Sequence, residues 1–318
     1  MLANDAKISQ RTVPMSIRGR SAMAAGNATN AAELLAQCPG IDWQVEPRPV
    51  YCQDNDYNMT QVIGKRAICR TDTGSALGIV GDKYEPIQTA TALSALDPYT
   101  EHPDGPKWHR AWQINGGSQI WAEARTSWTK PVVKGDLVGL SVLARLSHDG
   151  SKSLGFEFQI VRLVCDNGLA LPTVAEAVKI RHTAGYRPKL SDVAETLAAA
   201  HRQFDESVNL YARMAQIEPT REQVDEVLRR LIPDTKSNRA ELQRGRIEDL
   251  ARNGIGSDLL EHRLTAWSLY NGITELADHH SNASSDDDDM RLSSVLYGRN
   301  SEYKTDGLNI IRQVLAIA

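Results

Sequence analysis

Three short polar clusters bring together side-chain types that could do chemistry. They are SHDGS at 147–151, RLVCDNG at 162–168 and KIRHT at 179–183. Imidazoles and carboxylates ligate divalent metal ions, and a bound ion can activate water for phosphodiester cleavage. The residues of such a site would be His148, Asp149, Asp166 and His182. The alternative is that the first cluster is a turn and the second a strand exit.

A second enzymatic hypothesis pairs the Cys165 thiol, as nucleophile, with His148 or His182 as its base. The alternative is a buried core cysteine. No GxGxxG, GxxxxGK[ST], HExxH or GxSxG string occurs in the chain, so the mechanisms that those motifs imply have no support. We therefore assign no catalytic residue, metal site or cofactor, and the sequence favours a role other than catalysis.

The distribution of charge points to a different function. The formal net charge is −4, which gives no overall attraction to nucleic acid, so binding to phosphates would need a local basic patch. Between Val161 and Leu190, five basic residues oppose only Asp166 and Glu176. The predicted nucleic-acid-binding residues are these five together with His182: Arg162, Lys179, Arg181, His182, Arg187 and Lys189.

One of these residues also has a structural interpretation. Arg162 shares the strand parity of Phe156, Phe158 and Ile160, a face on which an aliphatic residue is the default. It either ends the strand or forms a buried ion pair there, or it is placed for function. Four aromatic residues likewise have two interpretations, since they could stack on the bases of single-stranded nucleic acid or could belong to the core. They are Trp108, Trp112, Trp121 and Tyr186.

Glycine-containing turns predict an antiparallel sheet. Asp72-Thr73-Gly74, Asn115-Gly116-Gly117 and His148-Asp149-Gly150 each lie between runs that suit paired strands. The strongest pair consists of Val138–Leu146 and Leu154–Ile160, where apolar residues alternate with period two. The earlier run from Trp43 to Cys52 contains prolines and is expected to be an edge strand or a loop.

After Ser191 the apolar residues take helical spacing, beginning with a stripe that contains Val193, Phe204 and Val208. Thr220 and Gln223 form a capping-box pattern that opens a second helix. The predicted class is therefore α+β. We expect a mobile N-terminal arm at 1–30, an antiparallel β-rich domain at 31–190, and a helical region at 191–318 that packs on the sheet.

Composition limits where the protein acts. No apolar run approaches the length of about 20 residues that a membrane span needs, and the N-terminus lacks the apolar stretch of a secretory signal. The four cysteines are scattered without a CxxC pair, which argues against a zinc ribbon or a disulfide framework. We expect a cytoplasmic protein with reduced thiols and no membrane partner.

Several segments resemble the phage- and plasmid-borne family called domain of unknown function 932. They are RTDTGSALGIVGDKYEPIQ at 70–88, SHDGS at 147–151, RLVCDNGL at 162–169, IRHT at 180–183 and TAWSLYNGITELADH at 265–279. The resemblance runs from about Trp43 to the C-terminus and implies a mobile-element protein without an assigned activity. The order of hairpins and helices also looks loosely like that of single-strand annealing recombinases, an analogy of architecture that transfers no site.

The sequence leaves three functions open. The first is a nucleic-acid-binding protein, acting on single-stranded DNA during recombination and forming a homo-oligomer whose neighbouring subunits share a basic groove. The second is an interaction protein that inhibits a host factor, which the acidic net charge would suit. The third is a metal-dependent nuclease.

Overall fold

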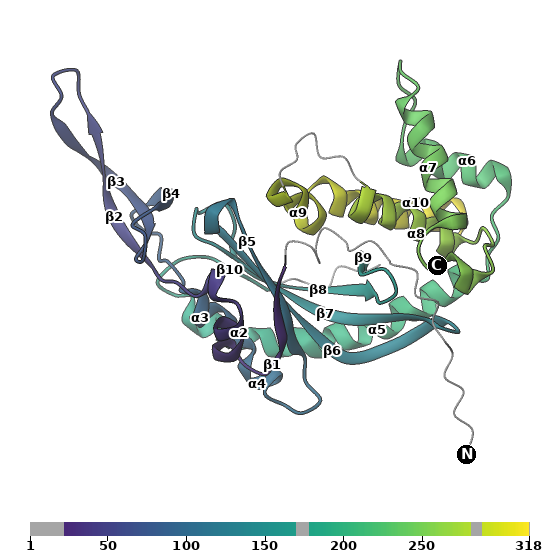
Figure 1. The fold of residues 1–318 in the computed structure, drawn as a ribbon, viewed down its shortest axis with the longest axis horizontal. Helices are drawn as coiled ribbons and strands as arrows, with labels where there is room; N and C mark the ends of the chain where they lie inside the picture. Colours follow the sequence, from purple (N-terminus) through teal and green to yellow (C-terminus); the bar gives the residue numbers. More distant parts are fainter. Residues whose placement is uncertain (1–21, 170–177, 281–287, 318) are drawn as a thin grey trace.

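The computed structural model describes residues 22–169, 178–280 and 288–317, and it shows antiparallel sheets in the N-terminal half and helices in the C-terminal half (Figure 1). The predicted α+β class is confirmed. In spatial order, the larger sheet consists of β1 (Met23–Ala28), β5 (Lys107–Ile114), β6 (Gln119–Val133), β7 (Asp136–Ser147), β8 (Leu154–Arg162) and β10 (Val178–Ile180). The short strand β9 (Asn167–Leu169) also pairs with β8.

All three predicted hairpin turns are present. They join β3 (Met59–Arg70) to β4 (Ala76–Gly81), β5 to β6, and β7 to β8. The last pair has Val142 opposite Phe158 and Leu140 opposite Ile160, so the alternating apolar residues of both strands share one face. These two strands lie inside the larger sheet, as their high apolar content predicts.

A second sheet forms an arm that projects from the body (Figure 1). Its strands, in spatial order, are β2 (Val45–Gln53), β3 (Met59–Arg70) and β4 (Ala76–Gly81). β2 is an edge strand, which confirms one of the two interpretations of its prolines. The hairpin that joins β2 to β3 was not predicted from the sequence.

Both helices that the sequence predicts at particular residues are present, one carrying the stripe after Ser191 and one opening at Thr220. The helices are α2 (Ala31–Gln37), α3 (Thr89–Leu93), α4 (Asp97–Thr100), α5 (Val193–Met214), α6 (Arg221–Leu231), α7 (Arg239–Asn253), α8 (Ala266–Glu275), α9 (Asp288–Tyr297) and α10 (Arg299–Val314). The predicted capping box is formed, since Thr220 and Gln223 each accept a hydrogen bond from the other's backbone N–H. This box fixes the start of α6.

Helices cover both faces of the larger sheet. Val193, Phe204 and Val208 on α5 are buried in the main core together with the apolar face of β7 and β8, which confirms the predicted packing of this stripe. On the opposite face, Trp112 and Trp121 pack with Leu292 and Val295 of α9 in a smaller apolar cluster.

One expectation for the N-terminal arm needs correction. Residues 1–21 lie outside the described part of the chain, but residues 23–28 form β1, which pairs with β5. This segment (MAAGNA) lacks apolar periodicity. It is held by backbone hydrogen bonds to β5, which any sequence can make once a partner strand is present.

All four cysteines are free, as expected from their spacing. Within the described ranges, no helix combines the length and the apolar character needed to cross a membrane.

Candidate nucleic-acid interface

Four of the predicted nucleic-acid-binding residues lie on one exposed segment. β10 pairs with β8 at the edge of the sheet, with Lys179 opposite Gly155, and the chain then continues through a turn into a 3₁₀ helix at 187–192. The side chains of Lys179, Arg181, Arg187 and Lys189 are exposed, and none forms an ion pair with a described residue. The Arg187 guanidinium lies 5.4 Å from the centre of the Tyr186 ring. We call these four residues the basic segment.

The fold brings the stretch of chain that contains Lys83 beside the basic segment. The N–H of Glu85 donates to the carbonyl oxygen of His182 over 3.0 Å, so the chain that leaves the arm runs beside the segment. Lys83 lies in this part of the chain and is exposed, as are the acidic Asp82 and Glu85. The sequence did not reveal Lys83 because it is distant in the chain and only tertiary contacts place it here.

Arg162 does not belong to this surface. It is 1% exposed, and its guanidinium donates two hydrogen bonds to Asp136, of 2.7 and 2.9 Å. The same guanidinium also donates hydrogen bonds to the carbonyl oxygens of Ile255 and Gly256. A guanidinium that is fully paired in the interior cannot contact a phosphate, so the ion-pair interpretation of Arg162 is the one that the structure supports.

His182 is also buried, beneath the basic segment. Its ring stacks on Tyr84 with 4.7 Å between centroids and an interplanar angle of 8°. Burial lowers the pKa of His182 from the ordinary value of 6.5 to about 4. The imidazole is therefore neutral at pH 7, and it supports the segment by packing instead of adding positive charge.

Three of the four residues of the hypothetical metal site are neighbours, since His148, Asp149 and His182 interact electrostatically with one another, but Asp166 lies apart from them. Asp166 is held by two arginines in a separate network, and the carboxylate of Asp149 accepts hydrogen bonds from Ser147 and Ser151. Among the described residues, no group of three or more His, Cys, Asp or Glu side chains has the arrangement of a metal site. The turn interpretation accounts for Asp149, because it closes the loop that joins β7 to β8.

Cys165 has the environment of a core cysteine. Burial raises the pKa of its thiol to about 12, so the thiolate needed for nucleophilic attack is absent at neutral pH. The imidazole of His279 approaches Cys165, but at the backbone carbonyl oxygen, with Nε2 at 3.1 Å. The nucleophile hypothesis is therefore not supported by this geometry.

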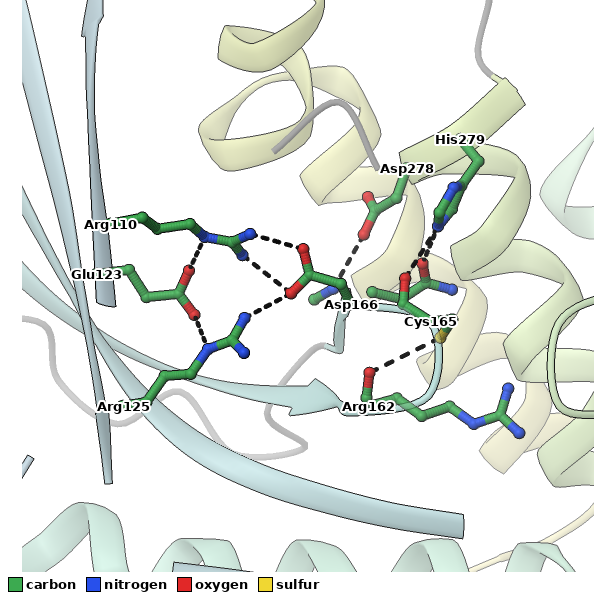
Figure 2. Close-up of polar contacts among 10 residues, drawn as sticks. Arg110, Glu123, Arg125, Arg162, Cys165, Asp166, Asp278 and His279 are labelled. Carbon is green, nitrogen blue, oxygen red and sulfur yellow. Dashed lines mark hydrogen bonds and ion pairs between the residues drawn. The ribbon is translucent and has the colours of Figure 1, made fainter. Parts of the chain in front are cut away.

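A ring of four charged side chains holds the loop after β8 (Figure 2). Arg110 donates to Glu123 over 2.7 Å and to both oxygens of Asp166 over 2.7 and 3.0 Å. Arg125 closes the ring with contacts of 3.2 Å to Glu123 and 2.5 Å to Asp166. Two cations and two anions cancel, so the ring presents no net charge to a ligand.

The same loop is fixed on its other side by the helical half (Figure 2). The N–H of Gly168 donates to Asp278, whose second oxygen accepts from Lys304, each over 2.8 to 2.9 Å. His279 Nε2 lies 2.7 Å from the side-chain oxygen of Asn167. The cluster at 162–168 thus joins the sheet to the helices, and its polar side chains are engaged in that contact.

The aromatic residues that were candidates for base stacking belong to the core. Trp108, Trp112 and Trp121 are fully buried, and Tyr186 is 6% exposed. Exposed aromatic rings occur instead on the arm, where Tyr51 is 50% and Tyr57 80% exposed.

Comparison with known proteins identifies a family. The model of the family described as domain of unknown function (DUF932) matches residues 76–296. This match covers more than half of the chain, and the chain therefore belongs to that family. No curated protein and no solved structure matches it.

Proposed function

We propose that this member of the DUF932 family binds single-stranded nucleic acid through the basic segment and Lys83. The observation that carries the proposal is the set of four exposed cations at 179–189 that form no ion pair with a described residue. An arginine or lysine that is not held in an ion pair can neutralise a phosphate and release its condensed counterions. Elsewhere in the chain many arginines are engaged, as Arg221 is with Glu248.

The local structure favours single strands over a duplex groove. The cations lie on an edge strand and a 3₁₀ turn, whereas a duplex is most often read by a helix or a two-stranded ribbon inserted into the major groove. A short row of cations at a sheet edge can follow one flexible phosphate backbone. Such a row covers only a few nucleotides, so several copies of the chain side by side would be needed for a continuous groove.

This surface fits a role in pairing single-stranded DNA during recombination of a phage or plasmid, carried out in the cytoplasm by a homo-oligomer. The alternative, an interaction protein that inhibits a host factor, has one feature in its favour, namely the exposed apolar side chains on the arm.

A fluorescence-anisotropy titration tests the proposal directly. The full-length protein is titrated into a labelled single-stranded oligonucleotide and, separately, into the corresponding duplex at 50 and 200 mM salt. We expect tighter binding to the single strand, with an affinity that falls steeply with salt. With five phosphate contacts the loss over this range is about 100-fold. Absence of binding to either oligonucleotide at 50 mM salt would overturn the proposal.

A further inference from the structure

The distal half of the arm is a two-stranded hairpin without other support. β4 pairs with β3 only between Lys65 and Cys69. Beyond this point β3 pairs with β2 alone, with Tyr51 opposite Gln61 and Gln53 opposite Met59, and Figure 1 shows this part extending away from every other element. A two-stranded hairpin is at best marginally stable in water, so a partner surface would stabilise this part of the arm.

The arm also carries more than half of the large apolar side chains that are exposed in the described part of the chain. Five of the nine large apolar side chains that are exposed in the described part of the chain belong to the arm: Tyr51, Tyr57, Met59, Ile63 and Ile79. Directly opposite residues of an antiparallel pair project to the same face, so Tyr51 and Met59 share one face of the hairpin. Clustered exposure of this kind marks an interaction surface.

Charge divides the arm into two parts. From Pro49 to Gly64 there is no Lys or Arg, and the tip carries the carboxylates of Asp54 and Asp56. Hydrogen bonds from Asn58 lower the pKa of Asp54, so the tip stays anionic. Lys65 and Arg66 follow immediately after Gly64, exposed and without an ion pair to a described residue. Asp82 is exposed beside these two cations, since its N–H donates to the Gly64 carbonyl oxygen over 3.2 Å. The two cations outnumber this carboxylate, so the order along the arm is anionic tip, apolar middle, cationic base.

We infer that the arm packs against the arm of a second copy of this chain, antiparallel and related by a two-fold axis. This arrangement places the anionic tip of each arm beside Lys65 and Arg66 of the other arm, and the apolar middles against each other. The residues from Met59 to Lys65 span about 20 Å at 3.3 Å per residue. The axis then passes near Gln61, midway between the two charged parts.

The charge pattern selects this partner over the alternatives. A phosphate backbone is repelled by the anionic tip, so nucleic acid does not suit the distal arm. A two-fold interface requires a surface that is complementary to itself, and the sequence of anionic, apolar and cationic parts meets this requirement when two arms run antiparallel. The inference does not depend on nucleic-acid binding, because the basic segment at 179–189 plays no part in it.

A charge swap tests the arrangement. Asp56→Lys and Lys65→Glu change exposed side chains that form no hydrogen bond or ion pair with another described side chain. The oligomeric state of the full chain is measured by sedimentation velocity over a range of concentrations, without nucleic acid. We expect the parent to be a dimer and each single variant to dimerise about tenfold more weakly, because like charges now face each other.

An equimolar mixture of the two variants gives the decisive result. In a mixed dimer, the altered tip meets the altered base and the unaltered tip meets the unaltered base, so the parent's affinity is restored. Glu226→Lys on α6 makes the same change of charge as Asp56→Lys at an exposed site far from the arm and should leave dimerisation unchanged. A monomeric parent, single variants that dimerise like the parent, or a mixture that fails to recover would each overturn the inference.

Discussion

Gly78 on β4 lies directly against Asp149 in the turn between β7 and β8. A Cβ atom at residue 78 would come within 2.5 Å of the Asp149 Cα and 2.8 Å of its Cβ. This contact, together with the hydrogen bond of 2.8 Å from the Tyr84 hydroxyl to the Ser147 carbonyl oxygen, attaches the arm to the larger sheet. The third predicted hairpin turn is therefore also the docking point of the arm.

Replacing Gly78 with Ala should separate the arm from this turn. The added methyl group meets backbone atoms that cannot move aside, and such overpacking costs about 1–3 kcal/mol. We expect a lower free energy of unfolding in urea and faster proteolysis between β4 and Tyr84. Gly81→Ala is the matched control, because no atom lies within 4 Å of its Cβ position. Equal stability of the two variants would contradict the close contact.

Breaking the ion pair between Arg162 and Asp136 should greatly reduce the free energy of unfolding. Arg162→Met leaves Asp136 buried without its cation, and breaking a buried pair in this way costs about 3–5 kcal/mol. Urea unfolding measures the loss. Arg221→Met removes the exposed pair with Glu248 and should cost less than about 1 kcal/mol. Similar losses in both variants would show that Arg162 is not buried as described.

Two buried histidines should make the protein less stable in mild acid. Burial, with a smaller effect from the neighbouring His182, lowers the pKa of His148 to about 3, and burial lowers that of His182 to about 4. In the unfolded chain both take up protons near pH 6.5. Stability is therefore complete above pH 6.5 and falls as the pH drops toward the two lowered values.

The double variant His148→Leu, His182→Leu isolates this effect. At pH 5 each histidine accounts for about 2 kcal/mol of lost stability, so the variant should lose less stability than the parent between pH 7 and pH 5. Carboxylates titrate equally in both proteins and cancel in the comparison. If the free energy of unfolding falls equally with pH in parent and variant, these imidazoles take up protons in the folded state as they do in the unfolded chain.

Phe204 on α5 anchors the helical half to the sheet. It is fully buried in the main core, so Phe204→Ala should reduce the free energy of unfolding by about 3–5 kcal/mol. Leu242→Ala is the control, because Leu242 is 72% exposed. An unfolding midpoint equal to that of the parent would show that Phe204 does not contribute to the core.

The features that the sequence predicted well are local. Turns such as Asn115-Gly116-Gly117 need residues with positive φ, and glycine supplies them within a few positions of the strands that they join. The turn between β2 and β3 lacks glycine and uses Tyr57 at a φ of 68°. A tyrosine is rare in that conformation, and the arm was missed for this reason.

The features that the sequence did not reveal depend on long-range contacts. The parity of Arg162 showed that a charge falls on an apolar face, but no local pattern named Asp136 as its partner. Likewise, the ring that holds Asp166 joins β5, β6 and the loop after β8, across a bulge between Trp108 and Arg110 that shifts the register. For this reason, the nucleic-acid-binding residues predicted from local charge included Arg162 and omitted Lys83.

Salt dependence gives the most specific test of the basic segment. For single strands, the logarithm of affinity falls with the logarithm of salt concentration by about 0.7 per phosphate contact. The double variant Arg181→Ala, Lys189→Ala should therefore bind more weakly and show a slope smaller by about 1.4, with unchanged sequence preference. Fluorescence anisotropy at four salt concentrations measures the slope.

A matched variant shows whether position or total charge matters. Arg229→Ala with Lys236→Ala removes two exposed cations near α6 that form no ion pair with a described residue, so the net charge changes by the same amount. If binding depends on the basic segment, this control keeps the affinity and slope of the parent. If both double variants change the slope equally, the oligonucleotide is attracted by the charge of the whole protein surface, and Arg181 and Lys189 do not contact its phosphates.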